Sequence, residues 1–201
     1  ADQAYDVMSA IAKQTQDAEP RTTKWQQIVT TWAQLKLAVA SGSLAAKDSN
    51  VRHTELIAQV LDVLDLTLDY YGLSLDPEAS GYHMIMAILA HMPHLTESLG
   101  QARARGTAYL SAKQLQHADQ AAIAIPMNIS KLHHANMARA LDKAMAAAPA
   151  LQTTLGEVAK QSDEAARKAF QLIETEILIA QPPGYPPVEY FQAMTRVIDT
   201  Q

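Results

Sequence analysis

Residues 48–72 read DSNVRHTELIAQVLDVLDLTLDYYG. The seam positions of this stretch recur in steps of three and four residues, at Ile57, Val60, Leu64, Thr67 and Tyr71. Three further apolar residues widen the same face, namely Leu56, Val63 and Tyr70. This period is typical of an amphipathic helix that packs lengthwise in a bundle. Capping side chains at residues 48–50 and the glycine at position 72 predict where this helix begins and ends.

The same period recurs along the rest of the chain and predicts further helices. They cover approximately residues 3–16, 22–41, 77–105, 111–147, 150–180 and 188–199. The apolar stripe of the helix 22–41 consists of Trp25, Ile28, Trp32, Leu35 and Val39. The seam of the helix 111–147 keeps a strict three-four spacing at Leu115, Ala118, Ala122, Ile125, Ile129 and Leu132.

Prolines and glycines predict how these helices start, bend and stop. Asp76 and Pro77 form a strong start signal, because Asp accepts free backbone N–H groups and Pro fits the first helical position. Pro93 and Pro126 should each bend a helix, because proline removes one backbone hydrogen bond. Gly106 should end the helix that contains Pro93.

The composition agrees with an all-α protein. Hydrophobic residues make up 48% of the 201 residues and aromatic residues only 5%, with seven glycines. Strand-forming runs are therefore scarce, and glycine is rare for a fold with many turns. Long helices pack lengthwise, so we expect an elongated antiparallel helical bundle of the four-helix type. We expect a single domain over residues 1–201, with two stacked modules as the alternative organisation.

Charge and cysteine content exclude several functions. The net charge is −5 and no face is rich in Lys and Arg, so we expect no nucleic-acid partner. The absence of cysteine excludes disulfides, thiolate zinc sites and c-type haem attachment. No stretch approaches the roughly 20 apolar residues that span a bilayer. No signal peptide is visible either, so we expect a mature protein or a fragment excised from a longer one.

The sequence contains none of the common enzyme motifs. It has no G-x-S-x-G, no H-E-x-x-H, no P-loop and no G-x-G-x-x-G. No Glu is followed by a His three residues later, as the di-iron bundles require. We therefore expect neither catalysis nor a cofactor.

The densest group of metal-binding residue types lies in the helix that contains Pro93. His83, Met86, His91 and His94 fall on roughly one side of this helix at about 100° per residue. Imidazole and thioether groups suit copper, nickel or zinc, so one interpretation is a metal site. The other is that methionine fills gaps in the core and histidine lies at the edge of the apolar stripe.

Arginine and tyrosine offer a different chemistry, the binding of a small anion. Arg52, Arg103 and Arg105 carry guanidinium groups, which suit carboxylate or nitrate, although a solvated arginine is the simpler interpretation. Tyr82 could add a hydroxyl group to such a site or could pack in the core.

A polar group follows the seam of the helix 111–147. It contains His133, Asn136 and Arg139, and Asn136 occupies the next seam position. A polar seam residue either contacts a ligand or fixes the register of the helix. The adjacent His133 and His134 should diverge on a helix, which argues against a joint metal or haem site.

Two motifs of the chain are specific: one begins at residue 72 and continues to residue 106, and the other covers residues 187–199. Residues 72–86 read GLSLDPEASGYHMIM, residues 100–106 read GQARARG, and residues 187–199 read PVEYFQAMTRVID. In this order they resemble three segments of the periplasmic regions of methyl-accepting chemotaxis proteins and related receptor kinases. The family patterns are S-N-L-x-L-D-P-D-x-D-S-Y-Y-L-M-D, L-G-x-x-R-A-x-G and P-x-x-Y-F-x-x-x-T-x-x-I-D. Arg103 matches the arginine of the second pattern, whereas His83 and Met86 replace a Tyr and an Asp of the first.

The resemblance implies a periplasmic ligand-sensing domain between two membrane helices of an inner-membrane chemoreceptor, and a homodimer. The ligand would be a small polar molecule, such as an organic acid or an inorganic anion, whose binding is relayed by small helix shifts. The candidate ligand-binding residues are Arg52, Tyr82, His83, Arg103 and Asn136. Two other interpretations stay open, a periplasmic metal-binding bundle and a structural module that receives its signal from a partner protein.

Overall fold

The computed structural model describes residues 20–113, 117–180 and 182–201. The chain divides into two compact units, Ala1–Tyr71 and Gly72–Gln201. Every regular element in the described ranges is helical, so the prediction of an all-α helical bundle is confirmed. The predicted helix 3–16 lies outside the described residues. None of the described helices is long and apolar enough to cross a bilayer.

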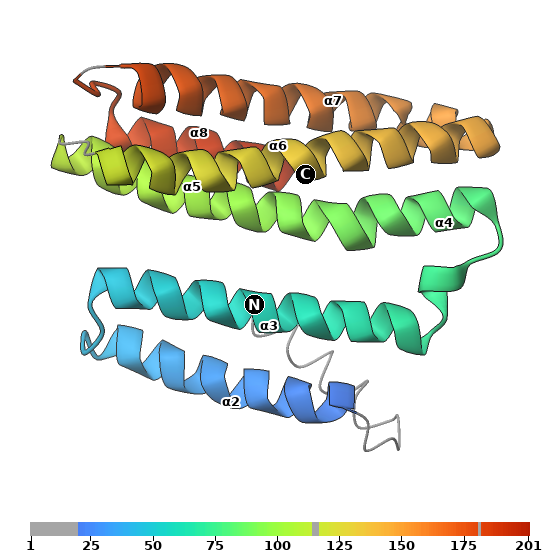
Figure 1. Cartoon of the computed structure of the whole chain (residues 1–201), viewed down its shortest axis with the longest axis horizontal. Coiled ribbons are helices and arrows are strands. Elements are labelled where there is room, and N and C mark those ends of the chain that lie inside the picture. The colour runs from blue at the N-terminus through green and yellow to red at the C-terminus, as the bar shows by residue number, and fades with distance from the viewer. Residues whose placement is uncertain (1–19, 114–116, 181) are drawn as a thin grey trace. The chain divides into compact units, whose positions relative to one another are not determined.

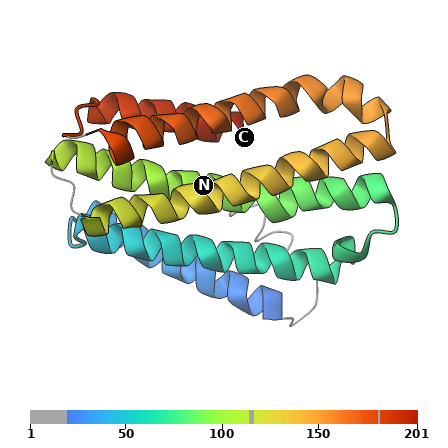
Figure 2. The same cartoon turned by 45° about the horizontal axis from the view of Figure 1, so that its top comes forward.

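The first unit contains the antiparallel helices α2 (Pro20–Ala40) and α3 (Ala46–Tyr70) (Figures 1 and 2). Gly42 lies in the turn between them with φ +68°, a left-handed conformation that glycine adopts without strain. The buried apolar residues between the two helices are Trp25, Ile28, Leu35, Leu56 and Val63. The predicted stripe of α2 is thus confirmed near its centre, while Val39 at its end is 49% exposed.

The predicted seam of α3 is wrong in its rotation about the helix axis. Leu56 and Val63, which the sequence places at the edge of the apolar face, are buried together with Leu68. Ile57 is 36% exposed, and Tyr71 just beyond the helix is 53% exposed. Apolar residues lie on several sides of α3, so the period allows more than one core direction. Packing against α2 selects the side that carries Leu56 and Val63.

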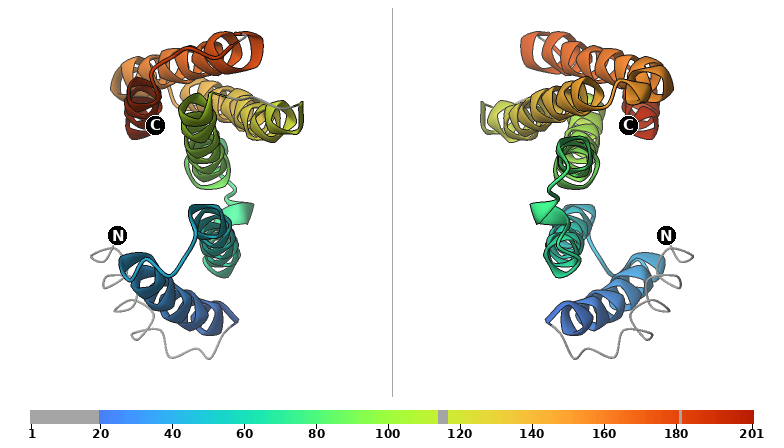
Figure 3. Two further views of the ribbon diagram at one scale, coloured as in Figure 1. Left: turned by 90° about the vertical axis from the view of Figure 1, so that its left-hand side faces the viewer. Right: turned by 90° about the vertical axis from the view of Figure 1, so that its right-hand side faces the viewer.

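The second unit is a bundle of helical rods, which Figure 3 shows end-on. After a short 3₁₀ turn, η1 (Leu73–Leu75), the first rod consists of α4 (Ala79–Ile85), the π-helical turn η2 (Met86–His91) and α5 (Met92–Ala112). The other rods are α6 (His117–Ala147), α7 (Ala150–Ile173) with its π-helical extension η3 (Glu174–Ile179), and α8 (Pro187–Thr200).

The first rod starts later than the sequence predicts: Pro77 precedes the helix, and Glu78 is the N-cap residue in place of Asp76. The bend lies beside the predicted proline. The side chain of Asp76 accepts a 2.8 Å hydrogen bond from the backbone N–H of Glu78, and the helix begins at Ala79. The predicted bend at Pro93 takes the form of the π-helical turn that ends two residues before it. Pro93 has no N–H to donate to the preceding turn, and a π turn is one way in which a helix accommodates such a gap.

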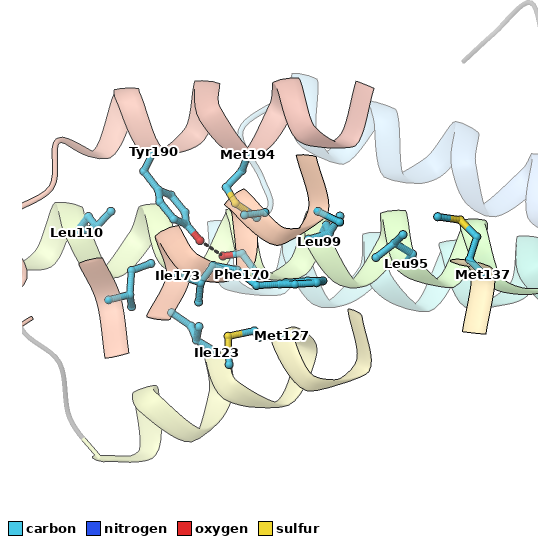
Figure 4. Packing of buried hydrophobic residues seen from close by; sticks show 14 of the residues in the cluster. Leu95, Leu99, Leu110, Ile123, Met127, Met137, Phe170, Ile173, Tyr190 and Met194 are labelled. Carbon is cyan, nitrogen blue, oxygen red and sulfur yellow. Dashed lines mark hydrogen bonds between the residues drawn. The ribbon is translucent and has the colours of Figure 1, made fainter. Parts of the chain in front are cut away.

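Gly106 does not end this helix, contrary to the prediction. Helix α5 continues to Ala112 and ends at Lys113, whose φ is +51°. A Cβ atom at Gly106 would lie 2.5 Å from the ring of Tyr190 on α8, so the glycine permits a close approach of the two helices. The hydroxyl of Tyr190 donates a 3.1 Å hydrogen bond to the carbonyl oxygen of Ala102 (Figure 4).

All four rods of the second unit contribute to one core (Figure 4). Its fully buried side chains include Leu95 and Leu99 on α5, Ile123 on α6, Ile173 on α7 and Met194 on α8. Burying a side chain of this size contributes about 1.5–3 kcal/mol relative to leaving it exposed. The core thus fixes the order and the rotation of the rods.

The predicted seam of α6 lies on the wrong face of the helix. Ile125, Ile129 and Leu132 are 59%, 42% and 59% exposed, whereas Ile123 and Met127 are buried. Ala and Ile are spread around α6, so the spacing at three and four residues does not identify one face.

The start of α6 also differs from the prediction. Ser111, where the sequence places the start, belongs to α5, and α6 begins at His117. Leu115 and the side chain of Ala118 lie outside the described residues. Pro126 lies inside α6 and is buried.

Candidate functional site

Three histidine side chains from two different rods meet in the second unit. His91 ends η2, His94 lies in the first turn of α5, and His133 lies on α6. The rings of His94 and His133 are stacked, with centroids 4.9 Å apart and planes at 19°. The centroid of His91 lies 5.6 Å from that of His133. We call His91, His94 and His133 the histidine cluster.

Local helix geometry explains this meeting. His91 and His94 are three residues apart and therefore lie on one face of the rod. Helix α6 runs alongside α4, η2 and α5, as Figure 2 shows, and places His133 against that face. The sequence separately singles out His91 and His94 in one helix and His133 in another, and the fold brings them together.

Burial and neighbouring basic groups both disfavour the protonation of two rings in the histidine cluster. Burial lowers the pKa of His91, and the nearby His94 and Arg139 lower it further. Burial also lowers the pKa of His133, with His94 and His91 adding to the effect. Within the described part of the chain, no carboxylate contributes to either shift. His91 and His133 thus lack a protein counter-ion that would favour their protonation.

Two ring nitrogens of the histidine cluster have no hydrogen-bond partner. They are Nδ1 of His91 and Nδ1 of His133, and both atoms are buried among the described residues. Buried polar atoms are normally paired, so an unpaired one suggests a group that binds something else. An imidazole can carry its proton on Nδ1 and donate it to an oxygen acceptor.

Asn136 and Arg139 extend the polar surface of α6 beyond His133. Nη2 of Arg139 donates a 2.8 Å hydrogen bond to Oδ1 of Asn136. Arg139 also lies close enough to His91 to lower its pKa. The predicted ligand residue Asn136 therefore orients the guanidinium group of Arg139 beside the histidine cluster. Guanidinium and imidazole N–H groups together suit a small planar oxyanion.

The structure keeps Tyr82 and His83 together but does not place them in the histidine cluster. Both lie on α4, and their rings meet edge to face with centroids 5.3 Å apart. His83 precedes His91 by eight residues, which is about 12 Å along a helix.

The predicted metal set of His83, Met86, His91 and His94 is not assembled as one ligand group. Met86 packs against the hydrophobic core. Among the described residues, no three His, Asp or Glu side chains are arranged to hold a metal ion. Stacked imidazole rings, such as those of His94 and His133, also do not converge on one point as metal ligands do.

Arg103 bridges α5 and α8. Its Nη1 donates a 2.8 Å hydrogen bond to Oγ1 of Thr195, and its guanidinium carbon lies 4.7 Å from the ring centroid of Phe191. Arg103 lies nine residues beyond His94, about 13 Å along the helix. These contacts support a packing role and do not include the histidine cluster.

Arg52 lies in the first unit, on α3. It lines a cavity of about 230 Å³ between α2 and α3 together with Thr31, Gln34, Gln59 and an acidic residue, Glu55. Among the described residues, Arg52 forms no ion pair. Its guanidinium group could therefore bind a small anion, and this cavity is a second candidate site.

The buried ring of His134 lies beside an ion pair that sequence reasoning missed, the more exposed Asp163 and Arg167. Its Nε2 lies 3.0 Å from Oδ1 of Asp163, and Arg167 donates from Nε to Oδ2 of Asp163 at 2.8 Å. Burial lowers the pKa of His134, while Asp163 acts in the opposite direction. His134 faces α7 and His133 faces α5, so the predicted divergence of the two rings is confirmed. The sequence signal for this pair is the spacing of Asp163 and Arg167, because residues four positions apart lie on the same face of a helix and can form an ion pair.

Comparison with known proteins gives one match. The model of the NIT family, described as nitrate and nitrite sensing, matches residues 1–201. No curated protein and no solved structure matches the chain significantly. The match supports the prediction of a sensor domain for a small anion and adds no support for an enzyme.

Proposed function

Since this chain belongs to the NIT family of nitrate- and nitrite-sensing domains, we propose that it binds nitrate or nitrite between α5 and α6. The binding groups are the histidine cluster and Arg139. The observation that carries this proposal is the pair of buried, unpaired Nδ1 atoms of His91 and His133, in surroundings where burial lowers both pKa values and no described carboxylate opposes it. A small anion would supply the missing hydrogen-bond acceptor and the missing negative charge together.

Other anion sites are less well supported. Arg103 also has a buried nitrogen without a partner, its Nε, but its Nη1 binds Thr195 and its guanidinium group lies over the ring of Phe191. Arg52 lies beside a carboxylate, Glu55, which opposes the binding of an anion. The cavity at Arg52 therefore remains the second choice for the same ligand.

Binding at this place would act on the packing of helices. A ligand held by residues of both α5 and α6 favours one arrangement of the two helices over another, and differential affinity is sufficient for signalling. Helix α5 is in turn fixed to α8 by the contacts of Tyr190 and Arg103. We propose that α8 passes the change on to the rest of the receptor.

The setting that we propose is the periplasmic side of an inner-membrane chemoreceptor, with the chain acting as a homodimer. The three segments that resemble chemotaxis receptors support this setting, as does the membership of a sensor family. An extracytoplasmic sensor needs only a ligand and two helix arrangements, without any chemical step on the ligand.

Isothermal titration calorimetry with nitrate, nitrite and chloride tests the proposal. We expect nitrate or nitrite to bind the whole chain, and His133→Ala and Arg139→Gln each to weaken binding about tenfold, as the loss of a charge-assisted hydrogen bond implies. Lys143→Gln is the matched control, because Lys143 is an exposed cation one turn beyond Arg139 on α6. If Arg52→Gln abolishes binding while His133→Ala and Arg139→Gln do not, the ligand binds in the first unit instead.

A further inference from the structure

Helix α6 also lines a groove with α7, and this groove is rich in cations. Lys131 and Arg139 on α6 and Arg167 on α7 line a volume of about 490 Å³. Asp142 is the acidic residue in the lining of this groove. Two further carboxylates lie beside the groove, Asp163 next to Arg167 and Glu174 next to Lys131, so an anion would bind through the donor groups that these pairs leave available and not through a net positive charge.

The floor of the groove is apolar. Phe170 is 7% exposed, and Ala135 and Ala138 complete the floor. The ring of Phe170 is held edge-on by the buried ring of His134, with centroids 5.6 Å apart. Nζ of Lys131 lies 5.9 Å from the centroid of the Phe170 ring. An apolar floor under a cationic rim suits an anion with a hydrocarbon part better than a bare inorganic ion.

The cations of the rim still have donor groups to offer. Arg167 uses only its Nε for Asp163, and its two terminal nitrogens have no partner among the described residues. They can bind a carboxylate through two parallel hydrogen bonds. Nζ of Lys131 lies 3.9 Å from Glu174, and both side chains are largely exposed at 40% and 52%. Such an ion pair contributes little, so a ligand can displace it.

We infer that this α6–α7 groove binds a dicarboxylate, an organic anion with two carboxylate groups on a short carbon chain. One carboxylate contacts the terminal nitrogens of Arg167 and the other contacts Lys131 or Arg139, while the carbon chain lies over Phe170. A monoanion would engage only one side of the rim, whereas a dicarboxylate joins α6 to α7. The inference does not depend on nitrate binding, although Arg139 contributes to both sites.

Calorimetric titration of the whole chain with glutarate tests this inference, with butyrate as the monocarboxylate reference. We expect saturable one-to-one binding of glutarate that Lys131→Gln weakens about tenfold, as the loss of a hydrogen bond to a charged group implies. Ala135→Leu fills the floor without changing any charge and should weaken binding as strongly. Lys168→Gln is the control, because Lys168 lines the separate α7–α8 groove, and it should leave the affinity unchanged.

The outcomes separate this site from the nitrate site. Absence of binding at about 10 mM glutarate, beyond the millimolar range of weak ligands, would overturn the inference. Equal weakening by Lys168→Gln and Lys131→Gln would also overturn it, because the effect would then reflect overall charge. His94→Ala should remove nitrate binding and leave glutarate binding intact. Circular dichroism and the melting temperature of Lys131→Gln and Ala135→Leu confirm that both variants are folded.

Discussion

The ring of Tyr190 lies so close to the backbone of Gly106 that a Cβ atom there would come within 2.5 Å of both Cε1 and the hydroxyl oxygen. Tyr190 is completely buried, and burial raises the pKa of its hydroxyl. The contact joins residues 100–106 to residues 187–199, two segments that the sequence distinguishes by resemblance. Their distinctive residues thus serve a common purpose, the close packing of α5 against α8.

Gly106→Ala should destabilise the protein by up to about 2 kcal/mol. Overpacking against a buried ring costs about 1–3 kcal/mol, and the better helix propensity of alanine offsets about 1 kcal/mol of it. Gly100→Ala on the same helix is the control, because nothing lies within 4 Å of a Cβ at that position. It should stabilise the protein by about 0.5–1 kcal/mol. Urea unfolding measures both changes, and equal effects of the two substitutions would contradict the packing at Gly106.

Ile123→Ala and Ile125→Ala should differ strongly, although both residues lie on α6. Ile123 is fully buried, so its truncation should cost about 2–5 kcal/mol, including the cavity that it leaves. Ile125 is 59% exposed, so its truncation should change the free energy of unfolding by at most about 0.5 kcal/mol. The free energies come from urea unfolding of the two variants. A larger cost at Ile125 would mean that the predicted seam, and not the observed face, is the core of α6.

The sequence predicts the class of the fold but not the rotation of every helix. The stripe of α2 is correct near Trp25, Ile28 and Leu35, where the predicted face coincides with the face that packs against α3. In α6 the apolar residues spread around the helix, so the face that carries Ile125 satisfies the period as well as the buried face. The prediction that Gly106 ends a helix is wrong for a similar reason. A glycine that ends a helix and a glycine that admits a neighbouring ring look alike in a sequence.

For the candidate site too, the sequence predicts which residues take part but not which helices bring them together. Residue chemistry identifies His91 and His94, and separately His133, Asn136 and Arg139. No local pattern states which two helices lie side by side or in which register, because long-range packing decides both. The sequence therefore identifies the residues of the site but not how they are arranged. The predicted metal site of His83, Met86, His91 and His94 rested on the residues of one helix alone.

The free energy of unfolding should decrease as the pH falls below about 6.5, the usual pKa of histidine. The pKa values of His91 and His133 are lowered in the folded state, so the unfolded chain binds more protons in this range and is favoured. The variant His133→Gln should lose less stability between pH 7 and pH 5.5 than the native chain. Burial raises the pKa of Glu97 and acts in the opposite direction, but it does so equally in both proteins. Urea midpoints at the two pH values provide the comparison, and parallel losses in both proteins would contradict the assignment.

Nitrate affinity should rise as the pH falls from about 7.5 to about 6, near the histidine range. A bound anion favours the charged form of His91 and His133, which burial and then the neighbouring basic groups otherwise disfavour. Binding should therefore take up protons, and calorimetry in two buffers with different ionisation enthalpies detects this uptake. An affinity that does not change with pH, without proton uptake, would mean that these rings do not contact the ligand.

The most direct test of the central claim is a nitrate titration followed by the ring resonances of the histidines in NMR spectra. Binding at the histidine cluster predicts saturable shifts for His91, His94 and His133, and none for His53, which lies on α3 in the first unit. Chloride at the same ionic strength should not reproduce these shifts. Unchanged resonances of His91 and His133 at saturating nitrate would contradict the account.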